Sequence, residues 1–132
     1  EIFLSPYSIL SWDRCLRRGD LDARLTALRT ACPTLNRWPN VRLHAPLFAK
    51  DMVTELNNYC DYIHHSGEAG KWVLGNVCAE KFLLREEDVE TVLADWREFV
   101  LGYDYDALWD QDFWDQWYET HDRPPDWYEE EG

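Results

Sequence analysis

Apolar residues recur at helical spacing through most of the chain. A Ser-Pro pair at positions 5 and 6 is a helix-start signal, and apolar residues follow at positions 9, 12 and 16 before Gly19. From Asp20, apolar residues recur three or four positions apart as far as Cys32. Pro33 is expected to end this pattern, because proline interrupts helical hydrogen bonding. The sequence therefore predicts two consecutive helices before a proline-rich loop over residues 33–46.

The clearest amphipathic pattern begins at Pro46. One face of a helix starting there would carry Phe48, Met52, Leu56, Tyr59, Cys60 and Ile63. We expect this helix to end at Gly67 or within the next three residues. Residues 71–84 fit either a helix or a short buried strand. The helix is favoured because no partner strand is evident, although residues 41–43 are compatible with extended backbone.

More helices are predicted in the last third of the chain. Residues 86–88 place three carboxylates in a first turn, where the helix dipole favours negative charge. The apolar stripe that follows is closed by Gly102 and consists of Val89, Val92, Leu93, Trp96 and Val100. Asp104 is expected to cap a final helix that runs to about residue 120.

These patterns predict an all-α protein, with a compact bundle of five or six helices, an acidic C-terminal helix and a flexible tail. A length of 132 residues suits one domain. We expect this domain to span residues 1–122, and residues 123–132 to form an acidic-aromatic tail. The sequence shows no apolar run of membrane-spanning length and no secretory signal, which predicts a cytoplasmic protein.

The formal net charge of −13 is distributed unevenly along the chain. Residues 1–84 carry ten basic and nine acidic side chains, a net charge of +1. Residues 85–132 carry 17 acidic side chains and three arginines, a net charge of −14. The expected domain therefore divides into a neutral body, residues 1–84, and acidic helices, residues 85–122. The excess of carboxylates argues against binding to nucleic acids or anionic membranes, which attract basic surfaces.

Acidic and aromatic residues alternate in the C-terminal segment. On a helix, an arc of about 80° would hold five carboxylates, those of Asp104, Asp112, Asp115, Glu119 and Asp122. The other side would hold Trp109, Phe113, Trp114 and Trp117. Carboxylates three or four residues apart repel each other, and a positively charged partner would relieve that repulsion. The simpler alternative is a solvated face above aromatic core residues.

Signals for catalysis and metal binding are weak. The sequence has no phosphate-binding loop, dinucleotide-binding motif, nucleophile elbow or zinc-protease motif. The four cysteines lack zinc-ligand spacing, and buried free thiols are favoured over a disulfide. Cys60 and His64 are four residues apart on an expected helix, but Cys60 would lie on its core side, away from solvent. We therefore expect no catalytic residue, no metal and no cofactor.

The favoured hypothesis is a small acidic binding protein, not an enzyme, that inhibits a nucleic-acid-handling protein or complex by occupying its basic surface. Such a DNA mimic presents carboxylates in place of phosphates. Two settings fit: a phage or viral anti-CRISPR or anti-restriction protein, and an immunity protein for a basic nuclease toxin. The predicted partner-binding residues are Asp104, Trp109, Asp112, Trp114, Asp115, Glu119, Asp122, Trp127 and Tyr128.

Two other functions remain open. The first is an acidic-aromatic interaction module or chaperone for a basic protein, such as a histone or ribosomal protein, within a larger assembly. The second is a small enzyme whose site no motif reveals. The aromatic pattern is compatible with a monomer or a homodimer.

Overall fold

The computed structural model describes residues 1–109, and this part of the chain is mostly helical, which confirms the predicted helical character. Its α-helices are α1 (Ile9–Arg18), α2 (Leu21–Asn36), α3 (Lys50–Thr54), α4 (Gly67–Cys78) and α5 (Val89–Gly102). Short 3₁₀ helices are η1 (Pro46–Phe48), η2 (Leu56–Asn58), η3 (Glu86–Asp88) and η4 (Asp106–Trp109). The sequence did not predict the two strands, β1 (Ile2–Phe3) and β2 (Leu43–His44).

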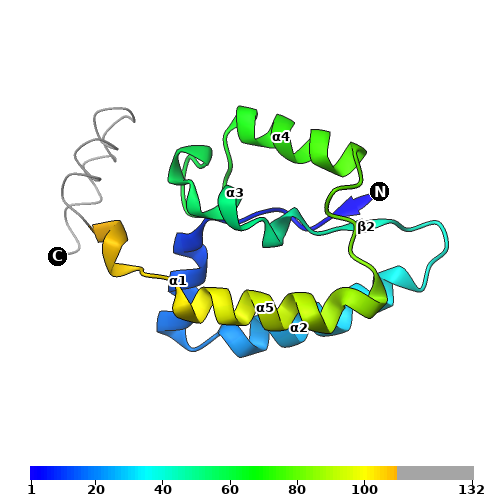
Figure 1. Cartoon of the computed structure of the whole chain (residues 1–132), viewed down its shortest axis with the longest axis horizontal. Coiled ribbons are helices and arrows are strands. Elements are labelled where there is room, and N and C mark those ends of the chain that lie inside the picture. Colours follow the sequence, from blue (N-terminus) through cyan, green and yellow to red (C-terminus); the bar gives the residue numbers. More distant parts are fainter. Residues whose placement is uncertain (110–132) are drawn as a thin grey trace.

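The described elements form three layers (Figure 1). Helices α2 and α5 lie side by side in the first layer, and α1 packs against both at one end. The two strands pass through the middle of the molecule, and α4 lies on the opposite side from α2 and α5. None of the helices within residues 1–109 is long and apolar enough to cross a membrane.

The boundary between α1 and α2 agrees with the sequence pattern. Gly19 adopts a left-handed conformation (φ 74°), and its N–H closes the end of α1 on the carbonyls of Cys15 and Leu16. A glycine at this position avoids the steric cost of a side chain in that conformation. Asp20 then occupies the N-cap position of α2.

The predicted end of α2 at Pro33 is wrong, because the helix continues through this residue to Asn36. Proline lacks one backbone donor, but tertiary packing holds the last turn in place. Leu35 packs against the main core, and the Asn36 amide donates a hydrogen bond to the carbonyl of Leu84 at 3.2 Å. Contacts distant in sequence therefore outweigh the local signal.

The predicted long helix from Pro46 to Gly67 is also wrong. The chain forms η1, α3 and η2 instead, because Ala49 and Glu55 adopt extended backbone conformations between them. Two clusters of buried side chains explain the breaks. Leu47 and Val53 belong to the main core, whereas Met52 joins a second cluster beneath α4. One straight helix face could not serve both clusters.

Gly67 begins a helix rather than ending one. The Ser66 hydroxyl accepts a hydrogen bond from the Ala69 N–H at 3.2 Å, and α4 follows as far as Cys78. This confirms the favoured helix for the first part of residues 71–84. The end of that segment is extended, and Leu83 forms an antiparallel bridge with His44 of β2.

The small sheet joins the start of the chain to its middle. β1 and β2 are parallel, with Ile2 opposite Leu43 and Phe3 opposite His44. Two-residue strands are too short to show the alternating pattern by which strands are recognised in a sequence. Only their pairing identifies them.

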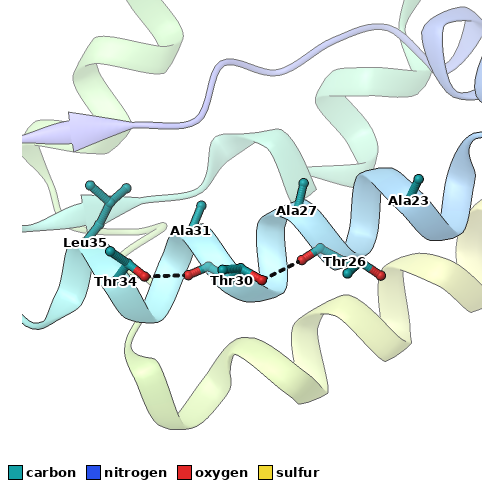
Figure 2. A pocket seen from close by; sticks show the side chains of 7 residues that line it. All are labelled: Ala23, Thr26, Ala27, Thr30, Ala31, Thr34 and Leu35. Atoms are coloured by element: carbon teal, nitrogen blue, oxygen red, sulfur yellow. Dashed lines mark hydrogen bonds between the residues drawn. The ribbon is translucent and has the colours of Figure 1, made fainter.

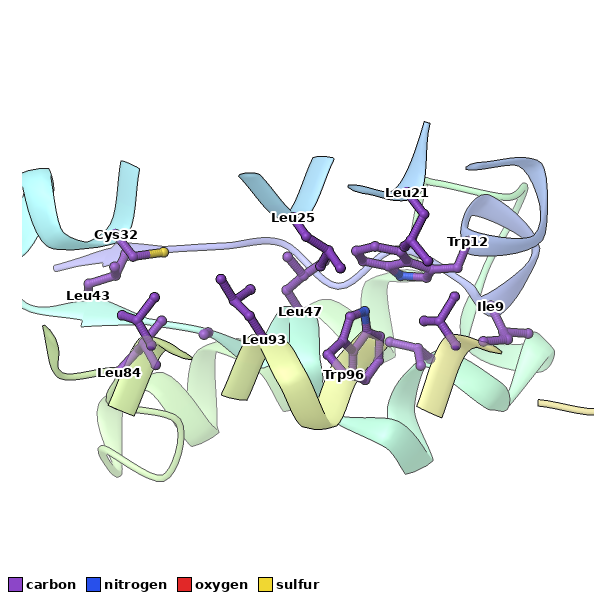
Figure 3. Close-up of a cluster of buried hydrophobic side chains, with 14 of the residues drawn as sticks. Ile9, Trp12, Leu21, Leu25, Cys32, Leu43, Leu47, Leu84, Leu93 and Trp96 are labelled. Atoms are coloured by element: carbon purple, nitrogen blue, oxygen red, sulfur yellow. The ribbon is translucent and has the colours of Figure 1, made fainter. Parts of the chain in front are cut away.

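Two fully buried tryptophans lie at the centre of the main core (Figure 3). Trp12 of α1 and Trp96 of α5 meet edge to face, with ring centroids 5.4 Å apart. Leucines of α2, η1 and α5 lie near them, and the same cluster extends to Leu43 of β2, so this core holds the first two layers together.

Replacing a core tryptophan tests this arrangement. We expect Trp96→Ala to lower the free energy of unfolding by about 3–5 kcal/mol, because it removes an aromatic contact and leaves a cavity. Trp38, which is 62% exposed, is the matched control, and Trp38→Ala should change stability by less than about 0.5 kcal/mol. Urea unfolding followed by far-UV circular dichroism measures both. Equal losses of stability in Trp96→Ala and Trp38→Ala would contradict the assignment of Trp96 to the core.

A second interaction holds β1 against β2. His44 is fully buried, and its Nε2 lies 2.5 Å from Glu1 Oε2. Arg42 extends the contact, since it pairs with both Glu1 and Glu80. The hydrogen bond from His44, assisted by Arg42, holds the pKa of the Glu1 carboxyl below its ordinary value.

This lowered pKa predicts a pH-dependent stability. A carboxyl with a lower pKa in the folded state stabilises the fold above its unfolded pKa, and this contribution is lost as the pH falls through the folded pKa. We expect Glu1→Gln to lower the urea midpoint at about pH 7, and the difference from the unmodified chain to shrink towards about pH 3. A difference that does not change with pH would contradict the assignment.

Candidate functional site

The described residues include two of the nine predicted partner-binding positions. Asp104 follows α5, and Trp109 is the last residue of η4. The positions outside the described residues are Asp112, Trp114, Asp115, Glu119, Asp122, Trp127 and Tyr128. The expected acidic helix beyond residue 109 and the tail at residues 123–132 also lie outside them.

Asp104 caps a turn at the point where the chain leaves α5. Its Oδ1 accepts a hydrogen bond from the Ala107 N–H at 3.3 Å, so within the described residues it caps the 3₁₀ helix η4. Tyr105 secures the same segment, because its hydroxyl donates to the carbonyl of Val100 at 2.9 Å. Burial raises the pKa of the Tyr105 hydroxyl, so this donor stays protonated.

A shallow recess beside Asp104 combines carboxylates with aromatic rings. It is lined by Lys50, Asp95, Glu98, Phe99, Gly102, Tyr103 and Asp104. Lys50 already places a cation in it, with Nζ 2.8 Å from Asp95 Oδ2 and 5.2 Å from the centre of the Phe99 ring. An ammonium group is stabilised by both neighbours. The recess therefore has the chemistry to contact basic side chains.

A row of aromatic contacts connects this recess to the core. The rings follow one another at centroid distances of 4.9–5.8 Å, through Trp12, Trp96, Phe99, Tyr103 and Tyr105. The turn between α5 and η4 is therefore held in place by packing.

Most carboxylates of residues 85–109 are not neutralised within the described structure. Glu90 pairs with Arg29 at 2.7 Å, and Asp95 pairs with Lys50. The others are exposed and form no ion pair within residues 1–109: Glu86, Glu87, Asp88, Glu98, Asp104 and Asp106. They lie towards the two ends of α5. Glu86–Asp88, Glu98 and Asp106 are not among the predicted binding residues, although the charge count for residues 85–132 contains them.

A second surface depression follows the outer face of α2 (Figure 2). It is lined by Ala23, Thr26, Ala27, Thr30, Ala31, Thr34 and Leu35. The threonine hydroxyls donate to the carbonyls four residues earlier, at 2.8–3.2 Å. These donors are therefore already used, and the depression contains no titratable side chain.

The expected helical pairing of Cys60 with His64 is wrong. Both residues lie in a chain reversal, and Cys60 is exposed rather than turned to the core. All four cysteines are free. Cys32 is buried, as predicted, whereas Cys78 is exposed. Burial raises the pKa of the Cys32 thiol.

Within residues 1–109, no three side chains that could act as metal ligands are close enough to hold a metal ion.

Comparison of the chain with protein-family models, curated proteins and solved structures finds no significant match. The function must therefore be argued from the chain's own surface.

Removing the cation of the recess tests its electrostatics. We expect Lys50→Met to lower the free energy of unfolding by about 1 kcal/mol or less, because Asp95, Glu98 and Asp104 would then repel each other without compensation. Adding about 0.5 M NaCl should reduce the difference in free energy of unfolding between Lys50→Met and the unmodified chain, because salt screens the repulsion. Lys71→Met is the control, since this exposed lysine of α4 forms no ion pair within residues 1–109. The same loss in both variants would contradict the prediction.

Proposed function

We propose that this chain is a small acidic binding protein that occupies the basic surface of a nucleic-acid-handling protein or complex. Binding blocks that surface, so the chain acts as an inhibitor without catalysing a reaction. The partner's lysines and arginines would normally contact nucleic-acid phosphates. We also propose the expected acidic C-terminal helix, which ends at about residue 120, and a cytoplasmic location.

The observation that carries the proposal is a set of six exposed carboxylates between residues 86 and 106 that form no ion pair within residues 1–109. They belong to a folded surface, because α5 is anchored in the core by Trp96. Three of the six, Glu98, Asp104 and Asp106, lie at or just after the C-terminal end of α5, where the helix dipole disfavours negative charge, so they destabilise the free protein. A basic partner offsets that cost, whereas an ordinary solvated face could mix both signs of charge.

The recess beside Asp104 supplies the contact chemistry. Lys50 shows the geometry that a partner's basic side chain would share, with a carboxylate on one side and an aromatic face on the other. Glu98 and Asp104 remain available for such contacts. Opposite charges on the two partners speed association and make it sensitive to salt.

A matched pair of charge reversals tests the proposal. The partner is first isolated on the immobilised chain from lysates of candidate host cells, then purified for affinity measurement by calorimetry. We expect Glu98→Lys with Asp104→Lys to weaken binding at least about tenfold, and Asp112→Lys with Asp115→Lys to abolish inhibition. Asp51→Lys with Glu68→Lys adds the same charge on exposed residues of α3 and α4. This control should weaken binding less than about threefold.

Competition defines the class of partner. Duplex DNA or RNA should displace the chain, and rising salt should elute it. Two results would reject nucleic-acid mimicry. One is an equal loss of binding affinity in all the charge-reversal variants, including the control. The other is a partner from which nucleic acid does not displace the chain. A different result would favour the alternative of a chaperone-like module. In that case, deletion of residues 123–132 would abolish binding, whereas the Glu98/Asp104 and Asp112/Asp115 charge reversals would not.

A further inference from the structure

The outer face of α4 is apolar, and no described element covers it. Helix α4 lies on the opposite side of the molecule from α2 and α5 (Figure 1). Its inner side buries Ala69, Val73 and Val77 in the second cluster. Its outer side leaves Leu74 56% exposed and Trp72 40% exposed. In the described part of the chain, this helix therefore has one apolar face in the core and another in solvent.

The middle of the outer face has the shape of a helix-packing surface. Four exposed residues share one side of α4 at helical spacing: Lys71, Leu74, Gly75 and Cys78. A glycine inside a helix is unfavourable. The described packing does not require one, because no atom of a more distant residue lies within 4 Å of a Cβ built at Gly75. Gly75 leaves a notch beside Leu74, where a second helix can approach closely.

The two ends of α4 carry opposite charges. Glu68 lies in the first turn, and Lys81 follows the last turn, where its N–H donates to the carbonyl of Asn76 at 3.1 Å. Both Glu68 and Lys81 are exposed, and neither forms an ion pair within the described chain. A helix of 12 residues is about 18 Å long, so the two charges are too far apart to pair within one copy.

We propose that two copies of this chain form a dimer through α4, with the two helices antiparallel about a two-fold axis between Leu74 and Gly75. This axis places Leu74 of each copy at the Gly75 notch of the other. It also places Glu68 of each copy opposite Lys81 of the other, because positions 68 and 81 are equally distant from the axis. The two-fold symmetry forms each of these contacts twice.

The distribution of charge supports a second copy as the occupant. Two chains with a net charge of −13 repel each other, so they can meet only across a surface that is not acidic. Residues 67–81 meet this condition, because they carry two acidic and two basic side chains: Glu68, Lys71, Glu80 and Lys81. The carboxylates of α5 lie on the opposite side and stay open. The dimer therefore does not depend on the proposed binding function.

Sedimentation of the full chain measures the dimer directly. The buffer contains about 0.15 M salt, which limits the general repulsion between acidic copies. An interface of one helix from each copy is small, so we expect a dissociation constant on the order of 100 µM. The average mass should rise from 15.8 kDa towards twice that value as the concentration approaches about 1 mM.

A charge swap tests the antiparallel pairing. Glu68→Lys and Lys81→Glu each place like charges opposite one another, and each should weaken the dimer at least about fivefold, since symmetry repeats the contact. Glu68→Lys makes the chain less acidic, so general repulsion cannot explain its loss. The variant with both substitutions should return to within about twofold of the unmodified chain, because opposite charges face each other again.

Two exposed leucines give a matched control for the apolar contact. Leu74→Gln should weaken the dimer at least about tenfold, because it removes the side chain that fills the notch. Leu101, which is 50% exposed at the end of α5, lies outside the proposed interface. Leu101→Gln should change the dissociation constant less than about twofold. Circular dichroism checks that each variant keeps its helical content.

Three outcomes would overturn this dimer. The first is a monomer mass for the unmodified chain up to about 1 mM, a result that needs no variant to fold. If Leu74→Gln then destabilised that monomer and Leu101→Gln did not, another segment of the same chain would cover α4. The second is a double charge variant that stays as weak as the single variants. The third is an equal loss of dimer in Leu74→Gln and Leu101→Gln.

Discussion

The contact between Trp12 and Trp96 is the interaction on which the described structure depends most. Both rings are fully buried, and they join α1 to α5 where these helices meet α2. Because α5 is fixed there, Phe99, Tyr103 and Tyr105 can pack in sequence towards the surface. The position of the turn that follows α5 depends on this packing.

The same constraint separates charge from core. A helix that buries Val89, Leu93, Trp96 and Val100 can place its carboxylates only on its remaining surface. Ion pairs with α2 and α3 neutralise Glu90 and Asp95, which lie near basic neighbours. Carboxylates towards the ends of α5 form no ion pair within residues 1–109. The acidic surface is thus a consequence of where α5 packs, and it is this surface that we connect with a basic partner.

The pattern of apolar residues predicted the apolar face and the end of α1, the start of α2 and α5, because each buries one continuous face against the same core. The Ser5–Pro6 pair did not mark the start of α1, which begins at Ile9 after Ser8. It failed between residues 46 and 66, where the side chains divide between two clusters. It also could not reveal the strands, whose pairing joins residues about forty positions apart. For the candidate site, the charge count identified the acidic third, but not Glu98 or Lys50, because their meeting in one recess requires α3 and α5 to pack.

The sequence by itself determined the helical character of the chain and the concentration of negative charge after residue 84, since periodicity and composition are local properties. The tertiary structure decided which apolar residues share a core, and it therefore decided where the helices break. It also reversed the environment of Cys60. A helical pattern placed this thiol towards the core, whereas the reversal anchored by Tyr59 turns it to solvent beside His64. Burial of one neighbour in a distant cluster, which no local pattern encodes, made that difference.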